Sequence, residues 1–198
     1  PMRRSPDSHK GDNGIVAVIG GSAGIHGAPL LSALGAEASG ADMVFVAVPA
    51  VHTAVARQTS LNFQVRGFAG DELLPHDVEP LLQWLATMDA CVIGPGVART
   101  SESLDALYKL IAGCPCPMVL DASALQPWTL EAVRGHEAIL LPHLGECERM
   151  GLTQDQLSPM AAATGQVIHL KGPIDIVALP DGSAREVTGG SSGLTVGG

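Results

Sequence analysis

The chain has 198 residues, of which 46% are hydrophobic, and this is enough apolar material for one sizeable core but hardly enough for two. Its 20 acidic and 11 basic residues give a formal net charge of −9, which argues against a nucleic-acid partner because phosphate neutralisation needs clustered Lys and Arg. We therefore expect one domain over residues 1–198, with a flexible segment over residues 1–9.

Membrane and metal signals are weak. No apolar run approaches the roughly 18 residues of a membrane span, and the first residues lack the hydrophobic segment of a signal peptide. We expect a cytoplasmic protein with no membrane partner. Cys91 and Cys147 stand alone in the sequence, and Cys114-Pro-Cys116 is one residue short of the usual zinc spacing. Free buried thiols in a reducing compartment are the expectation.

Short apolar runs bounded by Gly or Pro alternate along the chain with segments of helical period. Strands are predicted over 15–20, 43–48, 90–94, 117–121, 138–142, 166–172 and 175–180, with possible further strands at 62–68 and up to about 188. Helices are predicted over 28–41, 78–88, 101–113, 126–135 and 147–165. Strands that are apolar on both faces favour a mostly parallel sheet, so the alternation predicts a doubly wound, three-layer α/β/α fold.

Chemistry-bearing residues gather directly after the predicted strands. The stretches GGSAGIHGA, GPG, DASAL, PHLGE and KG each follow a strand, and ligands of such sheets bind at the carboxyl ends of the strands. The first loop lacks the offsets of a dinucleotide fingerprint, and no P-loop pattern occurs in the chain. These observations predict one long cleft with backbone amides for phosphates and a few charged groups.

Seven ordered motifs carry a family resemblance that extends from Lys10 to Gly198. They are HKGDNG, GGSAGIHGA, DACVIGPGV, VLDASAL, LPHLGE, HLKGPIDIVALPDG and TGGSSGLTVGG. Together they resemble the NAD(P)H-hydrate dehydratases of the ribokinase-like superfamily. The chain departs from the family pattern at Ser123, where Asp is common, and at Leu141, where Thr often precedes Pro-His.

The resemblance implies an enzyme, a carbon–oxygen lyase that repairs hydrated NADH or NADPH. ADP or ATP would phosphorylate the ring hydroxyl with Mg²⁺ present, and loss of phosphate would restore the dihydropyridine. We lean towards ADP as the donor, because the short single-domain chain resembles bacterial members of the family, although the residues themselves do not decide between ADP and ATP. The family also implies a homo-oligomer, by resemblance a tetramer. Two alternatives stay open, a ribokinase-like kinase for a small alcohol such as a vitamin precursor, and an inactive nucleotide-binding module.

Residue roles follow from the matching motifs. The resemblance implies substrate contacts at Ala28, Gly96, Asp121 and His143, a magnesium role for Glu146, and nucleotide contacts at Lys171, Gly172, Pro173, Ile174, Asp175 and Gly198. Each charged position also has an ordinary structural explanation. A strand-terminal Asp or a Glu in a first helical turn can cap a helix, and a lone His or Lys after a strand can be merely hydrogen-bonded or exposed.

The glycine-rich stretch EVTGGSSGLTVGG has two interpretations, a frayed tail or one side of an anion hole. In the family this stretch continues into Thr-Gly-Asp at a helix start, where backbone amides hold phosphate. We favour the anion hole, and the resemblance places the catalytic aspartate beyond Gly198, so the domain is expected to be incomplete at this end.

Overall fold

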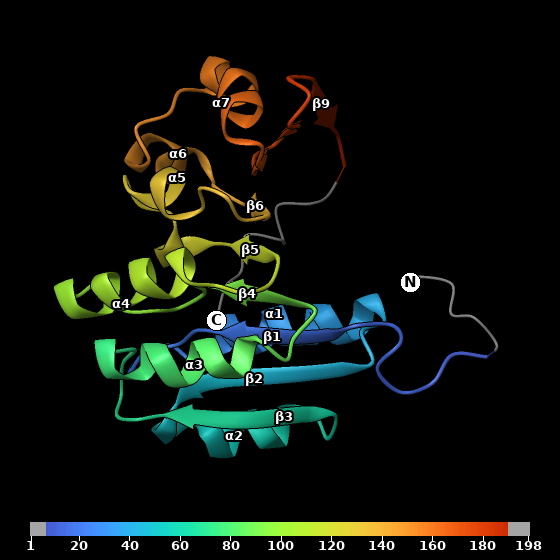
Figure 1. Ribbon diagram of the computed structural model, residues 1–198, viewed down its shortest axis with the longest axis vertical. Coiled ribbons are helices and arrows are strands. Elements are labelled where there is room, and N and C mark those ends of the chain that lie inside the picture. The colour runs from blue at the N-terminus through green and yellow to red at the C-terminus, as the bar shows by residue number, and fades with distance from the viewer. Residues whose placement is uncertain (1–6, 190–198) are drawn as a thin grey trace.

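The predicted apolar runs form neighbouring strands of one sheet in the computed structural model, which describes residues 7–189 (Figure 1). The strand order is β3-β2-β1-β4-β5-β6-β7-β8-β9, with β1 to β7 parallel and β8 and β9 antiparallel. Their bounds are β1 Ile15–Ile19, β2 Met43–Pro49, β3 Phe63–Phe68, β4 Ala90–Ile93, β5 Met118–Leu120, β6 Ala138–Leu140, β7 Val167–Leu170, β8 Asp175–Ala178 and β9 Ala184–Val187. The mostly parallel sheet and both optional strands are confirmed.

Seven helices of the described region connect and cover these strands. They are α1 Gly27–Ser39, α2 Thr53–Thr59, α3 Val78–Leu85, α4 Ser101–Ala112, α5 Thr129–Ala132, α6 Leu144–Arg149 and α7 Leu157–Thr164, with 3₁₀ turns at η1 Ala50–His52, η2 Pro75–Asp77, η3 Ala122–Ala124 and η4 Gln154–Gln156. Within residues 7–189, no helix is long and apolar enough to cross a membrane.

Two hydrophobic clusters hold the layers together. The smaller one packs α1 and α2 against β1 to β3 through residues such as Leu30, Ala56 and Val46. The larger one packs helices α3 to α7 against the opposite face, with Leu107, Leu120 and Leu140 fully buried. Ile139, the middle residue of β6, is 40% exposed.

The chain reverses its direction of travel across the sheet between β1 and β4. From β1 it proceeds to β2 and β3 on one side and then returns to β4 on the other. Val18 of β1 therefore lies in register with Val46 of β2 and with Val92 of β4. Such a reversal directs the loops that leave β1 and β4 to opposite sides of the sheet. The crevice between these loops is where doubly wound sheets usually bind their ligands.

Three sequence predictions need correction. The single helix predicted over 147–165 is two helices, because Gly151 takes a left-handed φ of 78° after α6 and η4 intervenes before α7. Helix α2 was not predicted, since only Ala56 of its residues is buried and its apolar period is weak. All four cysteines are buried and free as expected, but Cys91 does not stand alone, because its Sγ lies 3.6 Å from that of Cys114.

Two predictions concern residues outside the described range. Gly198 and the glycine-rich stretch from residue 190 onward lie beyond it, as does most of the predicted flexible segment 1–9. The strand expected to reach about residue 188 is β9, which pairs with β8 at the edge of the sheet.

Candidate active site

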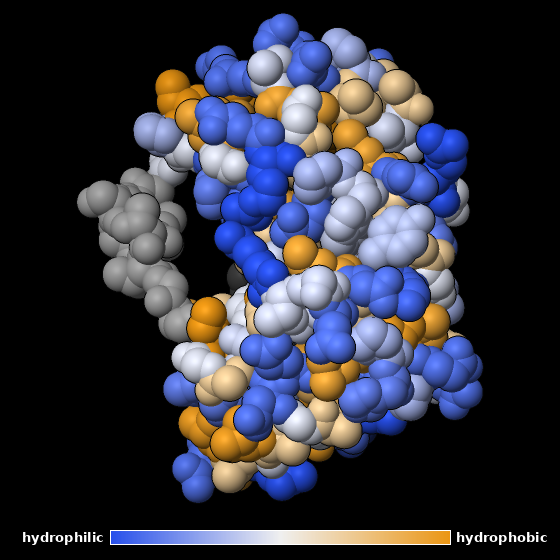
Figure 2. Space-filling view, turned by 90° about the vertical axis from the view of Figure 1, so that its left-hand side faces the viewer, coloured by the Kyte–Doolittle hydropathy of each residue, from blue (hydrophilic) through white to orange (hydrophobic). Residues whose placement is uncertain are grey.

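The loops that leave β1, β4, β5, β6 and β7 all emerge at the carboxyl edge of the parallel sheet, as the strand-end pattern predicts (Figure 1). A space-filling view of this side shows a band of hydrophilic residues along its middle (Figure 2). A hollow of the described surface lies elsewhere, at the amino ends of β4 to β7, and is lined by apolar residues such as Val119, Ile139 and Val167. We place the candidate site at the carboxyl edge because the charged groups converge there.

The loops after β1 and β4 pack against each other at the reversal point. The backbone N–H of Gly21 donates to the Pro95 carbonyl at 2.8 Å. A Cβ on Gly20 would lie 2.2 Å from the same carbonyl oxygen, so the approach requires glycine. Gly96 has a φ of 73° and reaches the start of α1, where Ala28 occupies the first turn. The structure thus brings the two predicted positions Ala28 and Gly96 into one corner.

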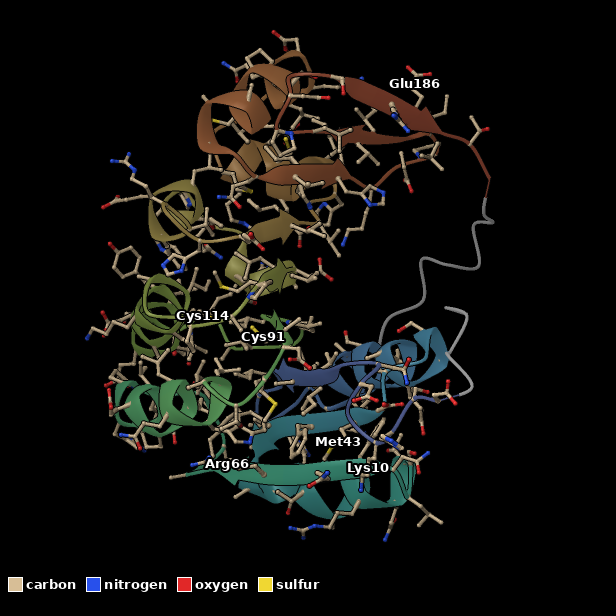
Figure 3. All side chains as sticks on the ribbon, turned by 45° about the vertical axis from the view of Figure 1, so that its right-hand side comes forward. Lys10, Met43, Arg66, Cys91, Cys114 and Glu186 are labelled. Carbon is tan, nitrogen blue, oxygen red and sulfur yellow. The ribbon has the colours of Figure 1, made fainter. Side chains whose placement is uncertain are left out.

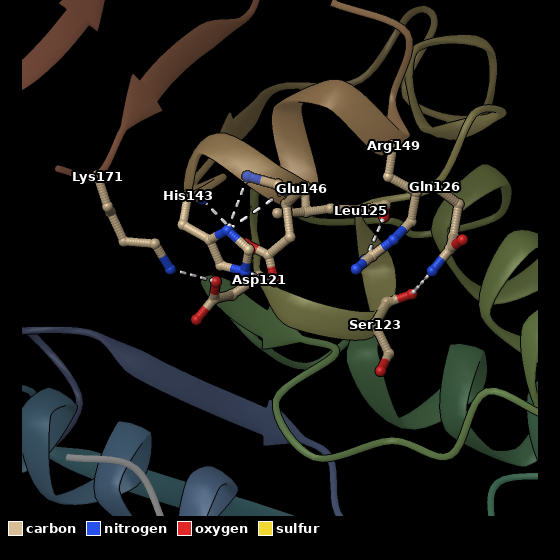
Figure 4. Close-up of polar contacts among 9 residues, drawn as sticks. Asp121, Ser123, Leu125, Gln126, His143, Glu146, Arg149 and Lys171 are labelled. Atoms are coloured by element: carbon tan, nitrogen blue, oxygen red, sulfur yellow. Dashed lines mark hydrogen bonds and ion pairs between the residues drawn. The ribbon is translucent and has the colours of Figure 1, made fainter. Parts of the chain in front are cut away.

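Asp121 and Lys171 meet although they are 50 residues apart in the sequence. The Lys171 ammonium donates to the Asp121 carboxylate at 2.6 Å, as Figure 4 shows. Lys171 is fixed at its backbone, since its N–H donates to the Pro142 carbonyl at 2.7 Å and it forms a parallel bridge with His143. Both side chains remain partly exposed, at 29% for Asp121 and 39% for Lys171. They can therefore exchange this contact for a ligand.

His143 is the N-cap residue of α6. Its Nδ1 accepts the backbone N–H groups of Gly145 at 3.0 Å and Glu146 at 3.4 Å. Because Nδ1 accepts, the ring proton of the neutral side chain lies on Nε2. The side chain is 56% exposed. His143 can therefore donate a hydrogen bond from Nε2 to a ligand. Its Nδ1 cannot accept a proton from a ligand in this arrangement, because it already accepts two backbone N–H groups.

Glu146 is buried beneath His143 and completes a capping box. Its Oε2 accepts the His143 backbone N–H at 3.0 Å, and its Oε1 lies 3.4 Å from His143 Nε2. Only 4% of the residue is exposed. Among the described residues, Glu146 belongs to no cluster of potential metal ligands. The capping contacts account for the position of Glu146 in this structure, and its magnesium role stays a prediction.

The segment Lys171–Asp175 forms a tight turn before β8. Asp175 accepts the Gly172 N–H at 2.9 Å with one oxygen, and its other oxygen lies 3.1 Å from His169 Nε2. The hydrogen bond from the Gly172 N–H lowers the pKa of Asp175, and the hydrogen bond with His169 lowers it further by a smaller amount. Pro173 and Ile174 are exposed at the tip of the turn. Asp175 therefore stabilises the turn through its hydrogen bonds, and the Lys171 ammonium gives this part of the edge its positive charge.

Several contributing residues were missed at the level of the sequence. Ala122, next to Asp121, is the one non-glycine residue with a positive φ, 54°, in the described chain. Strain of this kind is common at ligand sites, but alanine itself gives no signal of it. Ser123, at a family departure, donates to the Val97 carbonyl at 2.6 Å and links the β4 and β5 loops. His52 contacts the carbonyls of Ser22 and Ala23 at 2.8 and 3.1 Å.

The doubly wound sheet, its reversal point and the loops at its carboxyl edge form a fold that is shared with ribokinase-like proteins. A ribokinase-like superfamily protein from Enterococcus faecalis superposes with a TM-score of 0.82 at 22% identity, over 97% of this chain and 69% of that one. The sequence model of one family, described as NAD(P)H-hydrate dehydratase, matches residues 16–198. The chain belongs to this family.

Relatives of known name agree with this assignment. The ADP-dependent (S)-NAD(P)H-hydrate dehydratase of Nitrosopumilus maritimus is 35% identical over 192 residues, which cover 89% of this chain and 65% of that protein. The bifunctional NAD(P)H-hydrate repair enzyme of Archaeoglobus fulgidus is 36% identical over 198 residues, 99% of this chain and 41% of that enzyme. A Bacillus subtilis ADP/ATP-dependent NAD(P)H-hydrate dehydratase, co-crystallised with ATP/Mg²⁺, superposes with a TM-score of 0.72 at 26% identity, over 93% of this chain and 67% of that one.

Proposed function

We propose that this chain carries the dinucleotide and nucleotide sites of an enzyme that dehydrates hydrated NADH or NADPH at the expense of ADP or ATP. The observation that carries the proposal is the meeting of Asp121, His143 and Lys171 at one point of the carboxyl edge, in a chain of this family. The chain spans 65% of the length of the Nitrosopumilus relative and 41% of the Archaeoglobus relative, so the activity of the whole protein is part of the proposal.

The hydrated dinucleotide would bind between the β1, β4 and β6 loops. Ala28 and Gly96 offer backbone without a large side chain in the way, which suits the close approach of a flat ring. The Nε2–H of His143, on a side chain that is 56% exposed, would turn from Glu146 Oε1 to donate to a hydroxyl or amide oxygen of the substrate. Once Lys171 leaves Asp121 to bind the phosphate of the nucleotide, the Asp121 carboxylate would be able to accept a hydrogen bond from a hydroxyl of the substrate.

The nucleotide would bind beside the turn Lys171–Asp175. The Lys171 ammonium is the group that attracts polyphosphate, and the exposed tip at Pro173 and Ile174 offers an apolar surface for a base or sugar. Gly198 is assigned to the nucleotide by resemblance alone. Mg²⁺ would accompany the phosphates of the nucleotide, and we assign no step to Glu146.

The reaction needs positioning and charge rather than a covalent protein intermediate. The ring hydroxyl oxygen attacks the terminal phosphorus of the nucleotide, and the shortened nucleotide leaves. The electron pair of the ring nitrogen then forms a double bond to the adjacent carbon and expels phosphate, which restores the dihydropyridine after loss of a proton. The base for the hydroxyl proton is expected, by resemblance, at the Thr-Gly-Asp that follows this stretch in the family.

Binding and turnover test the proposal separately. Calorimetry of this chain with hydrated NADH and with each nucleotide in the presence of Mg²⁺ should detect both ligands. In the whole protein, ADP should support recovery of the NADH absorbance better than ATP. Assays of vitamin-precursor phosphorylation form the control for a small-alcohol kinase. Binding of nucleotide without hydrated NADH, together with phosphorylation of a precursor, would contradict the dehydratase. If neither ligand bound, the proposal that the carboxyl edge holds the dinucleotide and nucleotide sites would be wrong.

A further inference from the structure

Three cysteines that lie apart from the candidate active site form a compact group of sulfur atoms. Cys91 is the second residue of β4, while Cys114 and Cys116 lie on the connector between α4 and β5. Cys91 Sγ is 3.6 Å from Cys114 Sγ, and Cys114 Sγ is 3.9 Å from Cys116 Sγ. Figure 3 shows the side chains of Cys91 and Cys114 next to each other. All three residues are buried.

The spacing of the sulfur atoms matches that of thiolates sharing one metal ion. A metal–sulfur bond of about 2.3 Å puts the sulfurs of a trigonal site about 4.0 Å apart. The Cys91–Cys114 and Cys114–Cys116 distances of 3.6 and 3.9 Å lie close to this value, and all three Sγ atoms lie within 4.8 Å of one another. An ion at the centre of the triangle would need only small shifts of the sulfur atoms.

The site favours an ion whose coordination is complete with three soft ligands. The described residues contribute no fourth Cys, His, Asp or Glu atom to the group. His136 is nearby, but its Nε2 is 3.0 Å from the Ala112 carbonyl and donates to it. Thiolates bind both Zn²⁺ and Cu(I), but structural zinc sites almost always have four ligands, whereas Cu(I) is stable with three thiolates.

We propose that Cys91, Cys114 and Cys116 form a three-coordinate site for Cu(I), a soft monovalent cation. The ion would enter through the connector over residues 113–117, since Cys116 is the most exposed of the three at 8%. Binding breaks S–H bonds and forms Cu–S bonds, so each sulfur that binds as thiolate releases its proton to solvent, and no electron is transferred.

The test is an anaerobic titration of the full chain with Cu(I) held by a chromophoric chelator. The wild type should take one Cu(I) per chain from the chelator and show a thiolate-to-Cu(I) absorption band. Cys114→Ala should weaken binding by more than about 100-fold, because even outer-shell changes at metal sites cost about 10–100-fold. The matched control is Cys147→Ala, which removes a buried thiol whose Sγ donates to the Leu152 carbonyl outside the cluster. It should bind Cu(I) as the wild type does.

Circular dichroism of each apo variant checks folding, and Cys91→Ala and Cys116→Ala provide two further deletions should Cys114→Ala fail to fold. Equal Cu(I) affinity of wild type and any folded cluster variant would overturn the site. Loss of Cu(I) binding in Cys147→Ala would show that the ion does not bind at the cluster of Cys91, Cys114 and Cys116 alone, and would overturn the proposed location. A Zn²⁺ complex tighter than the Cu(I) complex and weakened by His136→Ala would replace the three-coordinate site with a four-coordinate one and overturn the proposal as stated.

Discussion

The loop after β4 contains two glycines with left-handed backbone whose substitution by alanine should have different effects. Gly94 has a φ of 114°, and a Cβ there would lie 2.2 Å from the Asp121 carbonyl oxygen and 2.8 Å from the Ala124 nitrogen. Gly96 has a φ of 73°, and the nearest atom to its Cβ would be Ile25 Cγ2 at 2.8 Å, a methyl group of a side chain that is 41% exposed and can rotate away. At Gly94 the oxygen and nitrogen in the way belong to the backbone and cannot easily move, whereas at Gly96 the nearest atom belongs to a side chain that can change its rotamer.

The magnitudes follow from strain and overlap. Left-handed backbone costs a residue with a Cβ about 1–2 kcal/mol, and overpacking of a rigid site costs about 1–3 kcal/mol more. We therefore expect Gly96→Ala to lower the free energy of unfolding by about 1–2 kcal/mol and Gly94→Ala by about 2–5 kcal/mol. Gly135 has a φ of 83°, and a Cβ added there would meet no atom within 4 Å beyond its own chain neighbours. This position therefore offers a control in which strain acts alone.

Urea unfolding followed by the fluorescence of Trp84 and Trp128 measures these differences. Gly135→Ala and Gly96→Ala should unfold at similar urea concentrations, with Gly94→Ala well below both. Equal midpoints for Gly94→Ala and Gly135→Ala would refute the argument from overlap. If Gly96→Ala stays folded as expected, any loss of hydrated-NADH binding in that variant reports on the cleft rather than on stability.

Three further outcomes are expected. His143→Ala should cost about 1 kcal/mol of unfolding free energy through the lost helix cap; calorimetry should show weaker binding of hydrated dinucleotide with nucleotide binding kept, and equal loss of both would contradict the division of the cleft. Asp121→Asn should change stability in urea by less than about 1 kcal/mol, because its pair with Lys171 is partly exposed, and a larger loss would mean a structural pair. The Gly172 N–H lowers the pKa of Asp175, so its carboxylate stabilises the fold above the unfolded pKa of about 3.9 and loses this effect as pH falls through the folded pKa. The stability difference between wild type and Asp175→Asn should therefore be constant above about pH 5 and shrink in acid, and a difference that grows in acid would reverse the sign.

Much of the fold was predictable because the signals are local. Strands apolar on both faces, such as Ile15–Ile19, have few alternatives in an α/β protein, and parallel strands place their carboxyl ends on one edge. The gathering of the predicted charged residues at that edge follows from topology. What the sequence could not supply was contact between distant segments, such as the 2.6 Å pair of Lys171 and Asp121.

The cysteine cluster illustrates the same limit. Spacing along the chain separates Cys91 from Cys114 by 23 residues and suggests two unrelated thiols. In the sheet, Cys91 lies in register with Met118, two residues after Cys116, and this register places the three thiols together. Ala122 is a second example, since its left-handed φ depends on the packing of η3 rather than on residue preference. The predicted homo-oligomer and cellular location stay predictions.

The polar groups of the carboxyl edge divide into two kinds, and the division indicates which of them recognise ligands. Glu146 is buried with both oxygens near His143, and Asp175 holds a turn, so a ligand could reach their oxygens only by dismantling local structure. Lys171 and Asp121 are partly exposed and paired with each other, and an exposed pair of this kind contributes at most about 1 kcal/mol. In the function proposed above, exchange of that pair for a phosphate on Lys171 would therefore cost little and would free the Asp121 carboxylate for the substrate. The pair is thus suited to link occupancy of the two halves of the cleft.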